Sequence, residues 1–275
     1  MLSRRTWLVG VVVLIAAAAT ARIVAPTARS PQPSAAATGA PVQFGTLPPG
    51  AELPSGMQCA RWVRASPSPE NRPANKTFND TGGQNVGPGF FPVSDSPQVK
   101  ALAARISGAF TGTTEEILRW AACKWGISQD IVFAQAAVES WWQQDELGDW
   151  GTQAGRCPPG HGLGADGRPG ACPESYGILQ DKYPLEQPSW PGIGKSTAMN
   201  ADAAYAIWRS CYDGYEVWLN DEPKGRLYRA GDLWGCVGRW NTGSWYTPHA
   251  ESYINLVQEY LRERIWDQPA FKQAG

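Results

Sequence analysis

Residues Ile127 to Gln143, together with the residue that follows them, have the sequence ISQDIVFAQAAVESWWQQ, and this stretch indicates the fold. Ser128 is a good N-cap, Asp130 suits the positive end of a helix dipole, and apolar residues then recur at helical spacing. Glu139 lies at the border of this apolar stripe. A carboxyl group among Trp and Val side chains loses hydration, which raises its pKa and keeps it protonated near neutral pH, as a general acid requires. The alternative is an ordinary, partly solvated glutamate.

The N-terminus has the layout of an export signal. Two arginines precede an apolar run from Trp7 to Ala19, and small residues follow the run. This order is typical of a signal peptide, and the run is also long enough for an uncleaved membrane anchor, so residues 1–25 predict export and a possible membrane tether. Residues 26–56 are rich in Pro, Ala, Ser, Thr and Gly and predict a linker. We therefore expect a secreted or cell-envelope location.

Charge and cysteine content narrow the class of protein. The formal net charge of −1 leaves no basic stripe to neutralise phosphates, which excludes a nucleic-acid partner. Six cysteines in an exported chain predict disulfides, and no Cys-x-x-Cys pair or histidine ligand set indicates a metal, so no metal or cofactor is expected. The pairing we expect is Cys157 with Cys172 across a Gly/Pro-rich loop, Cys211 with Cys236, and Cys59 with Cys123.

The chain divides into an irregular extension and a helical domain. Residues 57–95 are rich in Pro, Asn, Gly and Ser, with the Arg61–Arg64 stretch as their only strand-like patch. Residues 96–268 contain several helix signals: Ser96 followed by Pro97, a capping box from Thr113 to Glu116, and Thr247 followed by Pro248. No series of strands with regular turns is present. The sequence therefore predicts a mainly α domain with disulfide-stapled loops.

Three short motifs occur in order along the helical domain. They are Glu139-Ser140, Gly177-Ile178-Leu179-Gln180 and Trp240-Asn241-Thr242-Gly243. With these motifs, the chain resembles the soluble lytic transglycosylase family of the lysozyme-like superfamily over roughly residues 113–266. It departs from the family at Trp240, where the family has a tyrosine, and in the insertion between Cys157 and Cys172.

The resemblance implies a lysozyme-like fold and an enzyme that cleaves the MurNAc–GlcNAc bond of peptidoglycan glycan strands. Glu139 would protonate the glycosidic oxygen and then, as a base, accept the proton of the C6 hydroxyl, which closes a 1,6-anhydro ring. Ser140, Gln180, Trp240 and Asn241 would hold the substrate or orient the acid; for Asn241 in particular, the alternative is ordinary turn chemistry.

Aromatic side chains favour the same class of ligand. Their faces stack on sugar rings, so Trp142 is a further candidate for the saccharide groove.

Two other functions fit the same sequence. A goose-type-like lysozyme, which is a hydrolase, would need a second carboxylate to orient water, and Asp145, Asp149 and Asp181 are the candidates. Glu174 is the only rival to Glu139 as the acid. A non-catalytic glycan-binding wall module is the third reading, and the loss of the family's tyrosine at Trp240 leaves it open.

Overall fold

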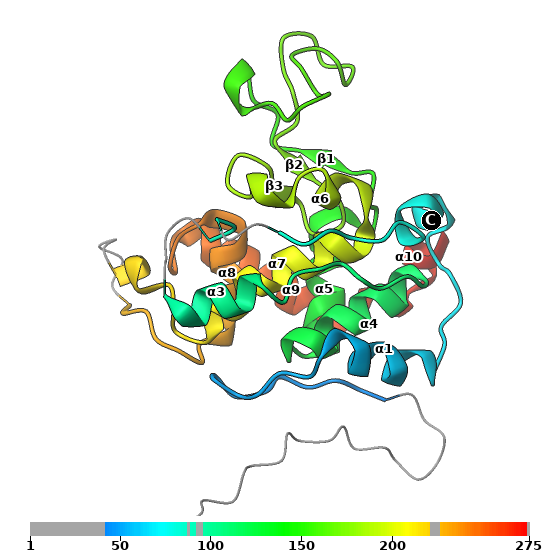
Figure 1. The fold of residues 1–275 in the computed structure, drawn as a ribbon, viewed down its shortest axis with the longest axis vertical. Coiled ribbons are helices and arrows are strands. Elements are labelled where there is room, and N and C mark those ends of the chain that lie inside the picture. The colour runs from blue at the N-terminus through cyan, green and yellow to red at the C-terminus, as the bar shows by residue number, and fades with distance from the viewer. Residues whose placement is uncertain (1–41, 87–88, 92–95, 221–225, 274–275) are drawn as a thin grey trace, which may run out of the picture.

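The computed structural model describes residues 42–86, 89–91, 96–220 and 226–273 (Figure 1). The expected signal peptide or anchor at residues 1–25 and the first part of the linker lie outside the described residues. Among the residues that are described, no helix is both long enough and apolar enough to cross a membrane.

The described residues are mainly helical, with 50% helix and 4% strand, which confirms the mainly α prediction. The α-helices are α1 (Gly56–Arg64), α2 (Lys76–Asn79), α3 (Pro97–Ala103), α4 (Thr114–Trp125), α5 (Gln129–Ser140), α6 (Gly192–Lys195), α7 (Thr197–Tyr212), α8 (Leu233–Thr242), α9 (Pro248–Glu263) and α10 (Pro269–Gln273). Short 3-10 helices are η1 (Pro73–Asn75), η2 (Ala154–Arg156), η3 (Gln187–Ser189), η4 (Val217–Asn220) and η5 (Ile265–Asp267). The lysozyme-like architecture stays a prediction.

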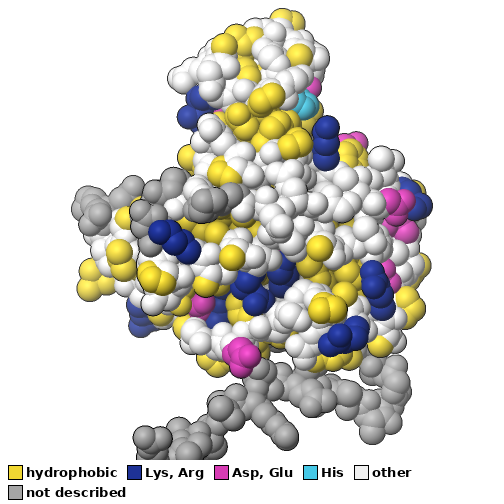
Figure 2. Space-filling model, viewed as in Figure 1, with side chains coloured by type: hydrophobic (Ala, Val, Ile, Leu, Met, Phe, Trp, Pro, Cys, Tyr) yellow, Lys and Arg dark blue, Asp and Glu magenta, His cyan; other side chains and the backbone are white. Residues whose placement is uncertain are grey.

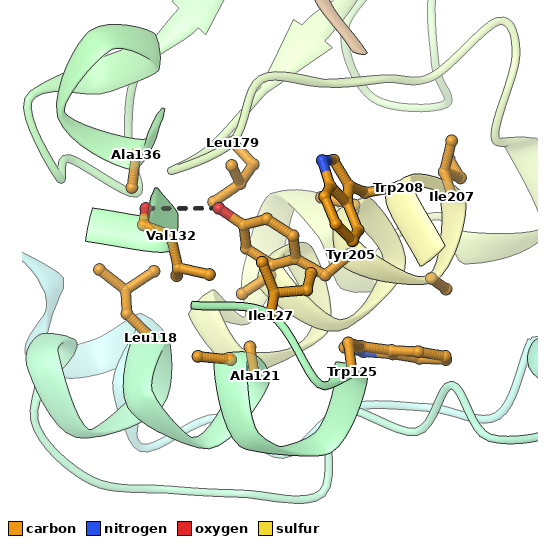
Figure 3. Close-up of a cluster of buried hydrophobic side chains, with 14 of the residues drawn as sticks. Leu118, Ala121, Trp125, Ile127, Val132, Ala136, Leu179, Tyr205, Ile207 and Trp208 are labelled. Carbon is orange, nitrogen blue, oxygen red and sulfur yellow. Dashed lines mark hydrogen bonds between the residues drawn. The ribbon is translucent and has the colours of Figure 1, made fainter. Parts of the chain in front are cut away.

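Helix α5 forms the centre of the helical body. It contacts α4 and α9, and α4 in turn contacts α7 (Figure 1). Figure 3 shows the core between α4, α5 and α7, where the Tyr205 hydroxyl donates to the carbonyl of Val132 at 3.3 Å. Nearly every residue of α5 up to Ala137 is buried, so α5 is a buried helix and not the amphipathic helix that its spacing predicted.

Local capping explains where several helices begin. The predicted capping box at the start of α4 is complete, with Thr113 and Glu116 each bonding the other's backbone. Ser96 and Thr247 cap α3 and α9 through their side chains, also as predicted. Ser128 occupies the N-cap of α5, but its side chain makes no capping hydrogen bond.

The extension before the helical domain is not wholly irregular. Residues Arg61 to Arg64 lie in helix α1 and not in a strand, because Ser55 caps the helix and Cys59 and Val63, four residues apart, bury one face. This face contacts α4, to which Cys59 is bonded through Cys123. The strand-like prediction for this patch is wrong.

A small antiparallel sheet lies at one end of the helical body (Figure 1). Its strands are β1 (Leu147–Gly148), β2 (Ser175–Tyr176) and β3 (Asp181–Lys182), and the register pairs Leu147 with Tyr176 and Tyr176 with Asp181. The loop between β1 and β2 projects beyond the sheet (Figure 1). Strands of two residues carry no alternation pattern, which is why the sequence did not predict them.

All three predicted disulfides are present. Cys157 bonds Cys172 at the base of the projecting loop, Cys211 of α7 bonds Cys236 of α8, and Cys59 of α1 bonds Cys123 of α4. Two of them therefore join helices of the body, whereas the third closes a peripheral loop.

This difference predicts unequal effects on stability. Removing the α7–α8 disulfide with Cys211→Ala and Cys236→Ala should lower the free energy of unfolding by ~2–5 kcal/mol, because the unfolded chain gains freedom. The matched variant, Cys157→Ala with Cys172→Ala, should lower the thermal midpoint of the helical body much less. Circular dichroism melts of both variants test this, and equal midpoints in the two would contradict it.

Candidate active site

A cleft of about 710 Å³ lies between the small sheet and the helices α7 and α8. Its walls include Asp149, Gln180 and Lys182 on the sheet side and the Arg239–Gly243 segment at the end of α8. Glu139, in the last turn of α5, also lines the cleft. The C-terminal ends of two helices and the small sheet thus meet around one carboxyl group.

The environment of Glu139 favours its protonated form. Burial raises the pKa of Glu139 to about 7, and this effect outweighs hydrogen bonds from Tyr253 and Trp240, which lower the pKa; Asp149 adds a smaller increase. Because the side chain keeps some exposed surface and lines the cleft, a ligand there can reach a carboxyl that is about half protonated at neutral pH. Such a group can donate a proton and later accept one.

Tyr253 of α9 holds this carboxyl in place. Its hydroxyl donates to Glu139 Oε1, and Gln135 of α5 provides a further hydrogen bond to Tyr253. Burial, followed by the charge of Glu139, raises the pKa of Tyr253 well above its ordinary value, so the hydroxyl keeps its proton. Tyr253 lies outside the three sequence motifs, in the helix that begins after Thr247. The sequence signal for its contact with Glu139 is indirect: Trp240 has no hydroxyl to donate, so another side chain can supply one.

Trp240 and Asn241 lie in the last turns of α8, beside Glu139. The indole N–H of Trp240 donates to the carbonyl of Leu179 at 3.2 Å and also bonds Glu139, whose pKa it lowers. Asn241 is exposed and lines the cleft. It is part of a helix that Gly243 ends in the left-handed conformation, so the alternative in which Asn241 belongs to a turn does not hold.

Gln180 lines the cleft but uses its side chain within its own turn. Its amide nitrogen donates to the carbonyls of Gly177 at 2.9 Å and Glu146 at 3.2 Å. Gly177 has φ +79°, and a Cβ there would lie 2.5 Å from side chains of Asn200 and Gln144, so only glycine fits. The amide oxygen of Gln180 is the atom left to meet a ligand.

Ser140 and Trp142 do not line the cleft. The Ser140 hydroxyl donates to the carbonyl of Ile178 at 2.9 Å and thereby ties the end of α5 to the Gly177–Gln180 turn. Trp142 is fully buried, and its indole N–H donates to the Phe133 carbonyl at 2.9 Å. The prediction that Trp142 contacts substrate is wrong because the chain turns inward after α5. Ser140 bonds the neighbouring turn and does not face the cleft.

Two of the other candidate carboxylates are unsuited to the roles considered for them. Arg156 bonds Glu174 at 2.6 Å and lowers the pKa of Glu174, so this carboxyl is ionised and cannot replace Glu139 as the acid. Asp145 is exposed and is not among the residues that line the cleft.

Asp181 is fully buried beside Glu186. Apart from the carboxyl group of Glu186, no described residue donates a hydrogen bond to either oxygen of Asp181. Burial, and then the charge of Glu186, raises the pKa of Asp181 well above its ordinary value, so the two carboxyl groups share a proton. A protonated, enclosed group cannot serve as a base for water.

Asp149 is the second carboxylate that the cleft does present. Burial raises its pKa, but hydrogen bonds from Lys182 and Ser175 outweigh burial and leave the pKa of Asp149 below its ordinary value. Its backbone has φ +49°, an uncommon conformation for a residue other than glycine. An ionised carboxylate and one that is about half protonated at neutral pH thus line the same cleft.

Within the described residues, no group of three or more His, Cys, Asp or Glu side chains is placed to hold a metal ion. No protein-family model, curated protein or solved structure matches this chain. A function for the site therefore has to be argued from its geometry.

The contact from Tyr253 predicts the titration of Glu139. Tyr253→Phe removes a hydrogen bond that stabilises the ionised carboxylate, so the pKa of Glu139 should rise above about 7. Carbon-13 NMR of the labelled glutamate carboxyl against pH measures this shift. Tyr260→Phe, on the same helix but in contact with Trp141, is the matched control and should leave the titration in place. An unchanged pKa in Tyr253→Phe would contradict the assigned role.

Proposed function

We propose that this protein is a peptidoglycan lytic transglycosylase with a lysozyme-like domain, and that Glu139 is its one catalytic acid and base. The observation that carries the proposal is a half-buried carboxyl with a pKa of about 7, bonded to Tyr253 and Trp240 and open to a cleft of about 710 Å³. A cleft of this volume accommodates more than one sugar ring.

The proposed reaction uses the two protonation states of Glu139 in turn. The neutral acid protonates the oxygen between MurNAc and GlcNAc, and that bond breaks while the substrate's own N-acetyl group stabilises the positive charge at C1. The carboxylate formed in this step then removes the proton of the C6 hydroxyl, whose oxygen closes the 1,6-anhydro ring on C1. Glu139 ends the cycle protonated, and no water is consumed.

The side chains beside Glu139 are placed where they could hold the substrate. Asn241 and the amide oxygen of Gln180 lie in the cleft walls and would bond the N-acetyl amide, while Trp240 both lines the cleft and bonds Glu139. Ser140 supports this set indirectly by holding the turn that carries Gln180.

The proposed location is outside the cytoplasm. Three disulfides are compatible with an oxidising environment. We propose that residues 1–25 export the chain, or anchor it, and that the domain then meets glycan strands in the cell envelope.

Replacing the acid tests the proposal directly. Glu139→Gln should abolish turnover of purified peptidoglycan while the melting curve stays near that of the wild type, because an amide is too weak an acid to transfer a proton to the glycosidic oxygen. Wild-type products should carry muramic ends lighter by one water in mass spectrometry, and turnover should fall as pH rises through about 7. Substantial activity in Glu139→Gln, or reducing ends in the wild-type products, would refute the assignment. No products from either protein, with glycan still bound, would indicate the binding module.

Asp149 favours a goose-type-like hydrolase as the second candidate. It is exposed, ionised and in the cleft that contains Glu139, as a base that activates water would be. Its bonds to Lys182 at 2.8 Å and Ser175 at 2.8 Å also give it a purely structural reason to be ionised.

Asp149→Asn separates the two reactions. In a transglycosylase this change should lower turnover by less than about 10-fold and leave the anhydro products unchanged, because Glu139 supplies both proton transfers. In a hydrolase it should remove a general base and cost ~10²–10⁴-fold. Initial rates and product masses for the wild type, Asp149→Asn and Lys182→Met, which removes the partner of Asp149, decide between them.

A further inference from the structure

A second cavity, of about 440 Å³, lies between α1, the end of α3 and α4, and Glu139 and the cleft residues are not part of it. We call it the α1–α4 pocket. Three cations line it: Arg64 of α1, Arg105 after α3 and Lys124 of α4. No aspartate or glutamate of the described chain is among its lining residues. Figure 2 shows several Lys and Arg side chains in the part of the molecule where α1 and α4 lie, with others spread over the rest of this face.

Asp202, a carboxylate beside the pocket, already accepts several hydrogen bonds. Asp202 accepts hydrogen bonds from Lys124 Nζ at 2.5 Å, from the Trp125 indole at 2.7 Å and from two backbone N–H groups. A further buried cation nearby, Arg209, is paired with Asp213 at 2.7 Å. The two carboxylates thus pair with Lys124 and Arg209; neither bonds Arg105, on which the charge of Asp202 acts without a hydrogen bond.

Arg105 is the cation of this group that no carboxylate bonds, and the charge of Asp202 offsets only part of the cost of its burial. Its Nη2 donates only to neutral carbonyls, those of Pro54 at 2.6 Å and Lys124 at 3.1 Å, and none of the described residues accepts a hydrogen bond from its Nε or Nη1. Burial, more than any neighbouring charge, lowers the pKa of Arg105. An unpaired guanidinium in a partly desolvated cavity is costly, and an anion beside it would remove that cost.

Arg64 brings a second unpaired charge to the rim. It lies over the ring of Phe110 at 5.2 Å, and no described carboxylate pairs with it. Phe110 stacks on Trp120 at 5.5 Å, and Trp120, Met57 and Ala60 supply the apolar part of the lining. The pocket therefore combines an apolar wall with two guanidinium groups that no described carboxylate bonds.

We propose that the α1–α4 pocket binds a phosphate group, as inorganic phosphate or as a phosphomonoester with a small organic part. Guanidinium groups match the oxygens of phosphate through paired N–H donors. A phosphate or a phosphomonoester carries about −1.5 to −2 charges near neutral pH, which matches two cations better than the single charge of a carboxylate. The apolar wall gives the organic part of an ester a surface to contact. This proposal does not depend on the activity of the cleft.

Calorimetric titration of the full chain, in detergent, with sodium phosphate, glycerol 3-phosphate and sodium acetate at matched ionic strength tests the proposal. We expect saturable 1:1 binding of phosphate, and of glycerol 3-phosphate if the natural ligand is an ester, with acetate much weaker. Arg105→Gln and Arg64→Gln should each weaken binding about 10-fold or more, since each removes a charged hydrogen-bond donor.

Two controls keep the outcomes distinct. Arg61→Gln changes the same charge at an exposed position of α1 outside the pocket and should bind like the wild type, and Glu139→Gln should also bind normally. Because Arg64 is exposed, its variant remains informative if Arg105→Gln fails to fold. Absence of saturable binding, equal binding of acetate, or an equal loss in Arg61→Gln would overturn the proposal.

Discussion

The structure depends on the burial of α5 with a carboxyl at its end. Helix α5 packs against α4 and α9 and buries nearly every residue up to Ala137, and Glu139 lines the cleft that opens at its last turn. An ionised carboxylate there loses hydration, and hydrogen bonds from two aromatic side chains restore only part of it. The resulting pKa of about 7 follows from where α5 ends in the fold.

The same constraint explains the arrangement of the motifs. The end of α5, the Gly177–Gln180 turn and the end of α8 are far apart in sequence, and they meet because each is bonded to another: Ser140 to Ile178, and Trp240 to Leu179. The turn therefore acts as the common partner of two helix ends. A change in any one of the three would displace the other two.

Features that depend on residues close together in the sequence could be predicted, whereas contacts between distant residues could not. Caps at Thr113 and Thr247 depend on residues three positions away, and both were predicted correctly. The bond between Tyr253 and Glu139 spans 114 positions, and no local pattern reports it. The prediction that placed Trp142 in the cleft failed for a related reason. Trp141 and Trp142 both have positive φ, which reverses the chain and turns the Trp142 indole into the core. The direction of such a reversal is fixed by tertiary contacts.

The shared proton of Asp181 and Glu186 has a consequence for the energetics of the whole domain. Burial raises the pKa of Glu139, Asp181, Glu186 and Glu216 in the folded state, whereas in the unfolded chain each returns to an ordinary value near ~4. At any pH between the unfolded-state pKa and the folded-state pKa of such a group, the native state holds more protons than the unfolded chain. Folding is therefore coupled to proton uptake by these four groups, whose contribution to stability grows as the pH falls, whereas Asp149 and Glu174, with lowered pKa values, contribute in the opposite direction.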